Sequence, residues 1–224
     1  MKLLRYGDIG QEKPGILDSD GNLRDLSNTI SDINGDFLSQ GGIEKINKLD
    51  LDVLPKVLGN PRLGLPVSGT PKLICIGLNY SDHAKESNMA IPTEPVVFMK
   101  AISSLNGPND DVILPNNSVK GDWEVELAVV IGKKAKNVDE SNALTHVAGY
   151  TICNDVSERE WQLEHGSQWS KGKSFDTFAP VGPWLVTKDE IENPHNLAMW
   201  LDLNGERMQT GNTRKMIFNV KFII

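Results

Sequence analysis

The sequence has few of the features that mark secreted, membrane or nucleic-acid-binding proteins. Its only two cysteines, Cys75 and Cys153, lie in apolar stretches, which predicts buried free thiols rather than a disulfide. No apolar run approaches the roughly 18 residues of a membrane-spanning helix, and no apolar leader precedes the first charges, so we predict a cytoplasmic protein. No basic run exceeds Lys133-Lys134 and the net charge is −7, which argues against a nucleic-acid partner.

What is present is an ordinary globular composition, with 39% hydrophobic and 24% charged residues over 224 positions. Prolines and glycines gather between Leu54 and Thr70, as in a linker or an extended crossover. We therefore predict a small N-terminal domain over residues 1–60 and a larger domain over 61–224.

Many short apolar runs and few helical patterns predict a mixed α/β, β-rich fold. Predicted strands cover 73–77, 95–101, 111–115, 123–132, 147–155 and 179–187, and predicted helices cover 43–49, 80–89, 139–145 and a stretch after Ser157. Hairpin turns are expected at residues 20–22 and at Asn204-Gly205. An amphipathic helix from about Arg214 stops in mid-pattern at Ile224, so the C-terminal part of the domain is expected to be missing.

The stretch GDWEVELAVV places Glu124 and Glu126 inside an apparent strand, where alternate residues share a face. Two like charges on one partly buried face must be neutralised. They could lie on the solvent side of an edge strand beside Lys or Arg residues. Alternatively, they could bind a hard divalent cation, which prefers oxygen ligands and needs a third carboxylate. Asp155, which ends the strand VAGYTICND, is the best candidate, although an aspartate there could instead cap the next helix.

Two further motifs carry groups suited to proton transfer. In GLNYSDHAKE, His83 and Glu86 are three residues apart and share a helix face, so the glutamate could orient the imidazole as a base toward water. They could equally be two solvated side chains on a surface helix. In QWSKGKSFDTFAPVGPW, Lys173 could stabilise an enolate, with Lys171 or a simple solvated lysine as the alternatives. The other histidines, 146, 165 and 195, have no such partner nearby in sequence.

Five motifs in this order resemble the fumarylacetoacetate hydrolase family, and specifically its smaller bacterial members with a short N-terminal domain. They are GLNYSDHAKE, the glutamate pair in GDWEVEL, NDVSEREWQ, KGKSFDTFAPVGPW and NGERMQTGNTRKMIF. The resemblance is strongest over residues 71–220. It departs at Ala101, where a proline is common, and at Ile224, after which the family continues into further sheet and a loop.

The resemblance implies a β-roll-like catalytic domain, a homodimer, and one Mg²⁺ or Mn²⁺ ion per site. It matches the metal ligands with Glu124, Glu126 and Asp155, the water-activating pair with His83 and Glu86, and the active-site lysine with Lys173. Tyr80, Arg159 and Gln162 would face a small keto-acid substrate.

The activity expected from the chemistry and the resemblance is hydrolysis of a carbon–carbon bond in a β-diketo acid, either an acylpyruvate or a 2,4-diketo-3-deoxy sugar acid. A complete His83–Glu86 pair suits water activation, which favours this reaction over decarboxylation of oxaloacetate. Hydration of a 2-oxo-pentenoate, isomerisation and ureidoglycolate cleavage remain alternatives on the same fold. A protein that only binds a metal and a keto acid, or an inactive truncated form, is the alternative from another class.

Overall fold

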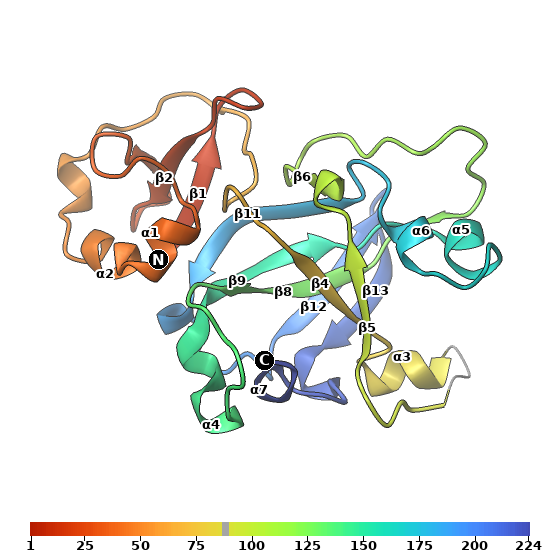
Figure 1. Cartoon of the computed structure of the whole chain (residues 1–224). Helices are drawn as coiled ribbons and strands as arrows, with labels where there is room; N and C mark the ends of the chain where they lie inside the picture. The colour runs from red at the N-terminus through yellow and green to blue at the C-terminus, as the bar shows by residue number, and fades with distance from the viewer. Residues whose placement is uncertain (87–89) are drawn as a thin grey trace.

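The computed structural model describes residues 1–86 and 90–224. Its centre is a seven-stranded sheet in the order β3-β2-β1-β11-β9-β8, with β6 paired in parallel to β11 (Figure 1). These strands are β1 (Lys2–Tyr6), β2 (Lys13–Leu17), β3 (Leu23–Asp25), β6 (Leu105–Asn106), β8 (Val125–Ile131), β9 (Val147–Asn154) and β11 (Ala179–Thr187).

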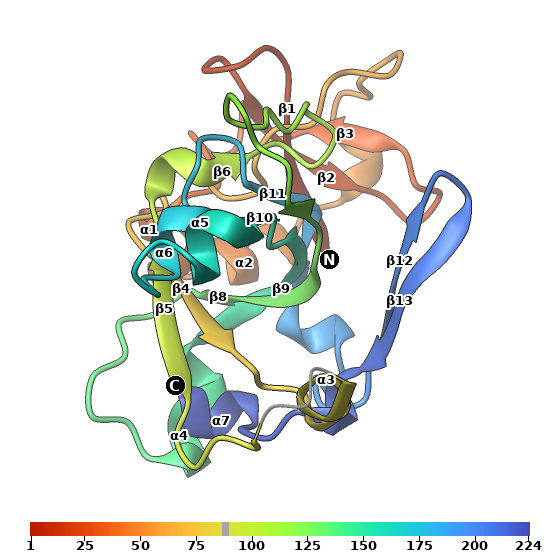
Figure 2. The same cartoon turned by 90° about the vertical axis from the view of Figure 1, so that its right-hand side faces the viewer.

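Three two-stranded sheets surround this sheet, and the β12–β13 hairpin extends along one side of the molecule (Figure 2). They pair β4 (Leu73–Gly77) with β5 (Val96–Lys100), β7 (Gly121–Asp122) with β10 (Ser157–Glu158), and β12 (Ala198–Leu203) with β13 (Glu206–Asn212). The helices are α1 (Gly35–Ser39), α2 (Gly42–Ile46), α3 (Ser81–Glu86), α4 (Glu140–Ala143), α5 (Arg159–Leu163), α6 (Ser170–Lys173) and α7 (Val220–Ile223). The 3₁₀ turns are η1 (Leu51–Val53), η2 (Ile102–Ser104), η3 (Leu144–His146), η4 (Lys188–Glu190) and η5 (Thr213–Lys215). The predicted β-rich, mixed α/β fold is confirmed.

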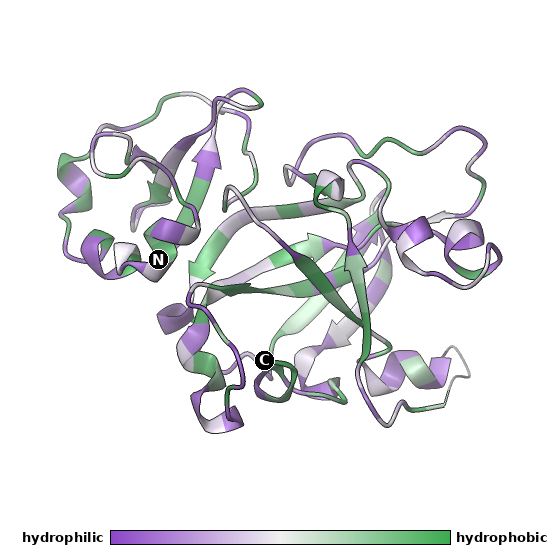
Figure 3. Cartoon of the chain, in the orientation of Figure 1, coloured by the Kyte–Doolittle hydropathy of each residue, from purple (hydrophilic) through white to green (hydrophobic). Residues whose placement is uncertain are grey.

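The N-terminal strands extend the central sheet, because β1 pairs antiparallel with β11 through Leu3 and Leu185. Both side chains are fully buried in one core with Ile16, Leu26, Ile33 and Ile46. Figure 3 shows hydrophobic residues along these strands, as burial of apolar surface requires. The first strands share both the sheet and the core with the second half of the chain. The predicted domain boundary near residue 60 stays a prediction.

Both predicted hairpin turns are confirmed. The β2–β3 turn contains Gly21 with φ 79°, and the β12–β13 turn places Asn204 and Gly205 at φ 53° and 85°. Positive φ at both central residues is the geometry that favours Asn-Gly in two-residue hairpins.

Two predicted elements are wrong. Residues 111–115 form no strand, and the Ile113 N–H instead donates to the Thr177 hydroxyl oxygen. The helix expected from Arg214 is replaced by η5 and, after a break, by α7. Asn79 causes the break, because its side chain exchanges two hydrogen bonds with the Phe218 backbone and so occupies groups that a helix would use. The predicted helix over residues 80–89 corresponds to α3 (Ser81–Glu86). Residues 87–89 of the predicted range lie outside the described part of the chain.

Candidate active site

Three acidic residues meet at one end of the β8–β9 pair. Glu124 immediately precedes β8, Glu126 is its second residue, and Asp155 directly follows β9. The antiparallel register pairs Val125 with Asn154, and the Asp155 N–H donates to the Glu124 carbonyl at 2.9 Å. Residues about 30 positions apart in sequence are therefore held as neighbours by backbone pairing. We call Glu124, Glu126 and Asp155 the carboxylate cluster.

Asp155 is almost fully buried and is held by two lysines. Its Oδ1 accepts from Lys100 Nζ at 2.6 Å and its Oδ2 accepts from Lys173 Nζ at 2.8 Å. Burial would raise the pKa of Asp155, yet the charges and hydrogen bonds of Lys173 and Lys100 hold that pKa below its ordinary value. Asp155 does not cap the following helix, because the side chain of Glu158 caps α5 instead.

Glu124 is also held by two cations. Its Oε1 accepts from Arg159 Nη2 and its Oε2 from Lys173 Nζ, both at 2.5 Å. Arg159 also donates to Gln162 Oε1 through Nη1, at 2.8 Å. Lys173, with only 2% of its side chain exposed, therefore bridges Glu124 and Asp155. Of the predicted residues, Arg159, Gln162 and Lys173 do lie at the cluster.

Glu126 receives no hydrogen bond from the part of the chain that the structure describes, and it is the electrostatically strained member of the cluster. Burial, followed by the negative charges of Glu124 and Asp155, raises the pKa of Glu126 to about 8, and nearby Lys173 offsets only part of that rise. The Tyr80 hydroxyl is also buried, without a hydrogen-bond partner among the described residues. Its pKa is raised by burial and then by the charge of Glu126. The half-buried carboxyl group of Glu126 and the buried hydroxyl of Tyr80 are thus left to a further partner.

The donor chemistry of the cluster fits a hard divalent cation, which prefers carboxylate oxygens. In the described residues, however, no three or more His, Cys, Asp or Glu side chains stand arranged as a ready-made ligand group. The ammonium group of Lys173 lies between Glu124 and Asp155, where it donates a hydrogen bond to each. The residues fit a metal ion provided that Lys173 moves aside when the ion binds.

The predicted water-activating pair lies on α3, which begins directly after Tyr80. His83 and Glu86 are both exposed, three residues apart on this short helix. Their role as base and orienting residue remains a prediction. Lys171, the competing lysine, donates to the His165 carbonyl from an exposed position, so it belongs to a different local structure from Lys173.

Of the remaining histidines, His165 and His195 contact nearby parts of the chain, whereas the Nδ1 atom of His146 is buried without a hydrogen-bond partner among the described residues. The His165 ring stacks on Trp161, and His195 Nε2 accepts from the Val220 N–H at 3.1 Å. Cys75 and Cys153 are free thiols, as predicted; Cys153 is buried, whereas Cys75 is only half-buried. Burial, and then the charge of nearby Asp155, raises the pKa of each thiol, which keeps both sulfurs protonated near neutral pH.

Sequence reasoning missed two residues at the cluster, Lys100 and Asp122. Lys100 is 2% exposed. The sequence pattern that could have predicted this burial is the position of Lys100 two residues after Phe98, which places both side chains on the inward face of β5. Asp122, which accepts from Arg159 Nε at 2.8 Å, continues the alternation of Glu124 and Glu126 by one step. Both could have been found by extending the strand periodicity that predicted the glutamate pair.

The cluster depends on close packing of α6 against α5. A Cβ atom added to Gly172 would lie 2.3 Å from the Glu158 carbonyl oxygen and 2.4 Å from the backbone nitrogen of Gln162. Only glycine permits this approach of the two backbones. Gly172 thereby places Lys173 beside the helix that carries Arg159.

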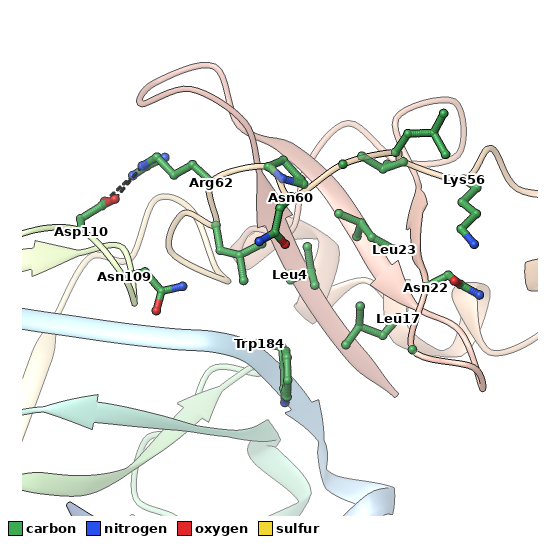
Figure 4. A pocket seen from close by; sticks show the side chains of 16 residues that line it. Leu4, Leu17, Asn22, Leu23, Lys56, Asn60, Arg62, Asn109, Asp110 and Trp184 are labelled. Carbon is green, nitrogen blue, oxygen red and sulfur yellow. Dashed lines mark hydrogen bonds and ion pairs between the residues drawn. The ribbon is translucent and has the colours of Figure 1, made fainter. Parts of the chain in front are cut away.

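A cavity of about 610 Å³ lies elsewhere, between the N-terminal strands, the 56–63 segment and β11 (Figure 4). Leucine side chains and Trp184 form its apolar lining, and the Arg62–Asp110 ion pair lies at one end. None of its lining residues belongs to the carboxylate cluster, so we place the chemistry at the cluster and not in this cavity.

Comparison with known proteins identifies the family. The model of the fumarylacetoacetate (FAA) hydrolase C-terminal domain matches residues 72–224. A Burkholderia lata protein named only as a candidate hydrolase is 58% identical over the whole of this chain and 79% of its own length. The chain belongs to the fumarylacetoacetate hydrolase family. The family consists of enzymes, and its solved structures include hydrolases and isomerases.

Two solved fumarylacetoacetate hydrolase family structures illustrate the match. The fumarylacetoacetate hydrolase of Exiguobacterium antarcticum is 35% identical with a TM-score of 0.87, covering 100% of this chain and 79% of its own. The maleylpyruvate hydrolase of Sphingobium sp. SYK-6, in complex with manganese(II) and pyruvate, is 26% identical with a TM-score of 0.82, covering 100% and 81%. No helix among the described residues is long and apolar enough to cross a membrane.

Proposed function

We propose that this protein is a divalent-metal-dependent hydrolase that cleaves a carbon–carbon bond in a β-diketo acid of the acylpyruvate or 2,4-diketo-3-deoxy sugar acid class. The observation that carries the proposal is the carboxylate cluster, in which three acidic side chains converge beside Lys173 and Arg159. The manganese and pyruvate bound by the related maleylpyruvate hydrolase support both the metal and the product class.

Glu124, Glu126 and Asp155 would hold the ion. A bound Mg²⁺ or Mn²⁺ would supply Lewis acidity toward the oxygens of a keto acid. Lys173, displaced from its bridge between two carboxylates, would turn its ammonium group toward the negative charge that develops on the departing enolate. Arg159, with Gln162 against its guanidinium, would bind the substrate carboxylate. The buried Tyr80 hydroxyl would donate a further hydrogen bond to the substrate.

His83 would take a proton from water, with Glu86 on the same helix to orient the imidazole. The exposed position of both side chains gives water access to the base. This part of the proposal separates hydrolysis from reactions that need no attacking water.

Isomerisation of an unsaturated keto acid is the second candidate, because several solved relatives carry the name of a hydroxyheptadiene-dioate or hydroxymuconate isomerase. Both reactions would use the carboxylate cluster and differ in whether water enters. The residues that choose between them are therefore His83 and Glu86.

The test is to assay the Mn²⁺-loaded protein on acylpyruvates, a diketo sugar acid, oxaloacetate and an unsaturated dioate, with wild type, His83→Ala and the control His165→Ala. We expect pyruvate release from an acylpyruvate that falls about 10²- to 10⁴-fold in His83→Ala and is unchanged in His165→Ala. Isomerisation or decarboxylation that survives His83→Ala would replace hydrolysis as the function. Manganese binding without turnover of any substrate would indicate a binding protein.

We also propose that the protein is a homodimer, which analytical ultracentrifugation (sedimentation) would test.

A further inference from the structure

Glu158 is a buried charge that the proposed chemistry does not use. Its side chain is 0% exposed, a position that a carboxylate rarely occupies without strong compensation. One oxygen, Oε2, accepts from the Trp161 N–H at 2.9 Å and caps α5. The other oxygen, Oε1, accepts from the Lys120 N–H at 3.0 Å and from the Ser118 hydroxyl at 3.3 Å.

The two oxygens therefore face two different segments. A helix cap needs only the contact with Trp161. The contacts with Ser118 and Lys120 join the start of α5 to the chain that runs directly into Asp122 and Glu124. The hydrogen bonds from both segments also keep the pKa of Glu158 below its ordinary value, although burial alone would raise it.

Arg159 lies at the point where these segments meet. Its backbone N–H donates to the Lys120 carbonyl at 2.9 Å. The two residues before it, in β10, pair with Gly121 and Asp122 of β7. Its guanidinium reaches Asp122 and Glu124, which lie on the segment that Glu158 holds. The position of this guanidinium relative to Glu124 thus depends on how the two segments are joined.

We propose that Glu158 is a positioning residue, which clamps the 118–120 segment to the start of α5 and thereby fixes the Arg159 guanidinium against Glu124. Its importance for turnover rests on the proposed function, in which Arg159 and Glu124 belong to the active site. The clamp itself is a property of the protein without metal or substrate, so it can be measured independently.

The experiment observes the Arg159 Nε–H resonance by ¹H–¹⁵N NMR in the metal-free protein, identified by its loss in Arg159→Lys. Glu158→Gln keeps the shape of the side chain but turns an amide NH₂ toward one of the two N–H donors, so one arm of the clamp is lost. We expect the resonance to move toward the position of a solvent-exposed arginine. The matched control is Glu164→Gln at the C-terminal end of α5, because Glu164 is exposed and contacts Lys120 only through the lysine ammonium.

An unchanged Arg159 resonance in folded Glu158→Gln would overturn the proposal, and so would an equal change in Glu164→Gln. If Glu158→Gln does not fold, Ser118→Ala removes only the hydroxyl donor and should shift the resonance in the same direction by less; no shift there would also overturn it.

Activity provides the second readout. We expect kcat/KM to fall about ten-fold in Glu158→Gln, as for other residues that orient active-site groups, with no further fall when Glu158→Gln is added to Arg159→Lys. Additive losses would mean that Glu158 acts through general stability and would refute positioning. If the wild type turns over no keto acid, the proposed function fails while the resonance still decides the clamp.

Discussion

Two networks of ionisable side chains in this molecule use the same types of group with different outcomes. The carboxylate cluster lies at the end of β8 and β9. The other network, which we call the N-terminal network, consists of Arg5, Glu12, Asp32, Arg62 and Asp110 and connects the N-terminal strands to the segment after β6.

In the N-terminal network, geometry and charge are well matched. Arg62 forms a two-pronged pair with Asp110, at 2.8 and 2.5 Å, and reaches Glu12 at 3.0 Å. Hydrogen bonds from Arg62 hold the pKa of Asp110 below its ordinary value. In the carboxylate cluster, by contrast, the pKa of Glu126 is raised. A satisfied network joins parts of a fold, whereas a network in which one carboxyl group lacks a positive partner, and so resists ionisation, is suited to bind a cation.

The largest test of this contrast removes the ammonium group at the centre of the cluster. Lys173→Met leaves Glu124 and Asp155 without their shared partner and removes the proposed enolate stabiliser. We expect kcat/KM to fall about 10²- to 10³-fold, the usual effect of losing one such donor. Lys171→Met, two residues away and exposed, should change kcat/KM less than about two-fold. Equal losses of kcat/KM in both variants would show that Lys173 has no specific role at the carboxylate cluster.

The second test uses the raised pKa of Glu126 in the metal-free protein. Because this pKa is about 8 in the folded state and 4.5 ordinarily, the protonated group contributes stability that is full below about pH 4.5 and is lost as the pH rises through about 8. Thermal unfolding should therefore show a Tm that falls between pH 5 and 8. Glu126→Gln should flatten this fall, and Mn²⁺ should reverse it in the wild type, with release of a proton on binding near pH 7. A parallel pH profile in Glu126→Gln would contradict the assignment.

The third test moves Lys173 without changing it. Gly172→Ala forces α6 away from the Glu158 carbonyl, so we expect about 1–3 kcal/mol of lost stability by denaturant unfolding, together with lower kcat/KM. Gly35→Ala is the control, because it also lies in a short helix but has open space where its Cβ would be. If Gly172→Ala loses stability and keeps full activity, Lys173 does not need this close packing.

Much of the cluster could be predicted from the sequence because strand periodicity is local. Alternation placed Glu124 and Glu126 on one face, and the end of the next strand provided Asp155. The same rule would have found Asp122 and Lys100 if it had been extended. The elements that were predicted wrongly depend on distant partners: Asn79 breaks the expected C-terminal helix from a position 139 residues away.

The role of Glu158 could not be predicted from the sequence for the same reason. In NDVSEREWQ it stands as one more acidic residue among several, and the pattern does not show that it is buried. Its proposed role depends on contact with the 118–120 segment, which is distant in sequence and is brought next to Glu158 only by the tertiary structure. Periodicity thus predicts which side chains share a face, whereas the partners of a buried charge are set by tertiary structure.

The smallest expected effect comes from breaking the N-terminal network. Arg62→Ala removes the two-pronged pair with Asp110, whose side chains are 26% and 18% exposed. A partly buried pair of this kind lies between an exposed pair, worth 0–1 kcal/mol, and a fully buried one, so we expect a loss of about 1–2 kcal/mol in the free energy of unfolding. Arg207→Ala, which breaks an exposed pair with Asp202, should lower the free energy of unfolding by less than Arg62→Ala does, because solvent screens this pair. Both variants should retain wild-type kcat/KM, since neither arginine contacts the carboxylate cluster. A loss of activity in Arg62→Ala alone would show that the two networks are coupled through the segment between Asp110 and Lys120.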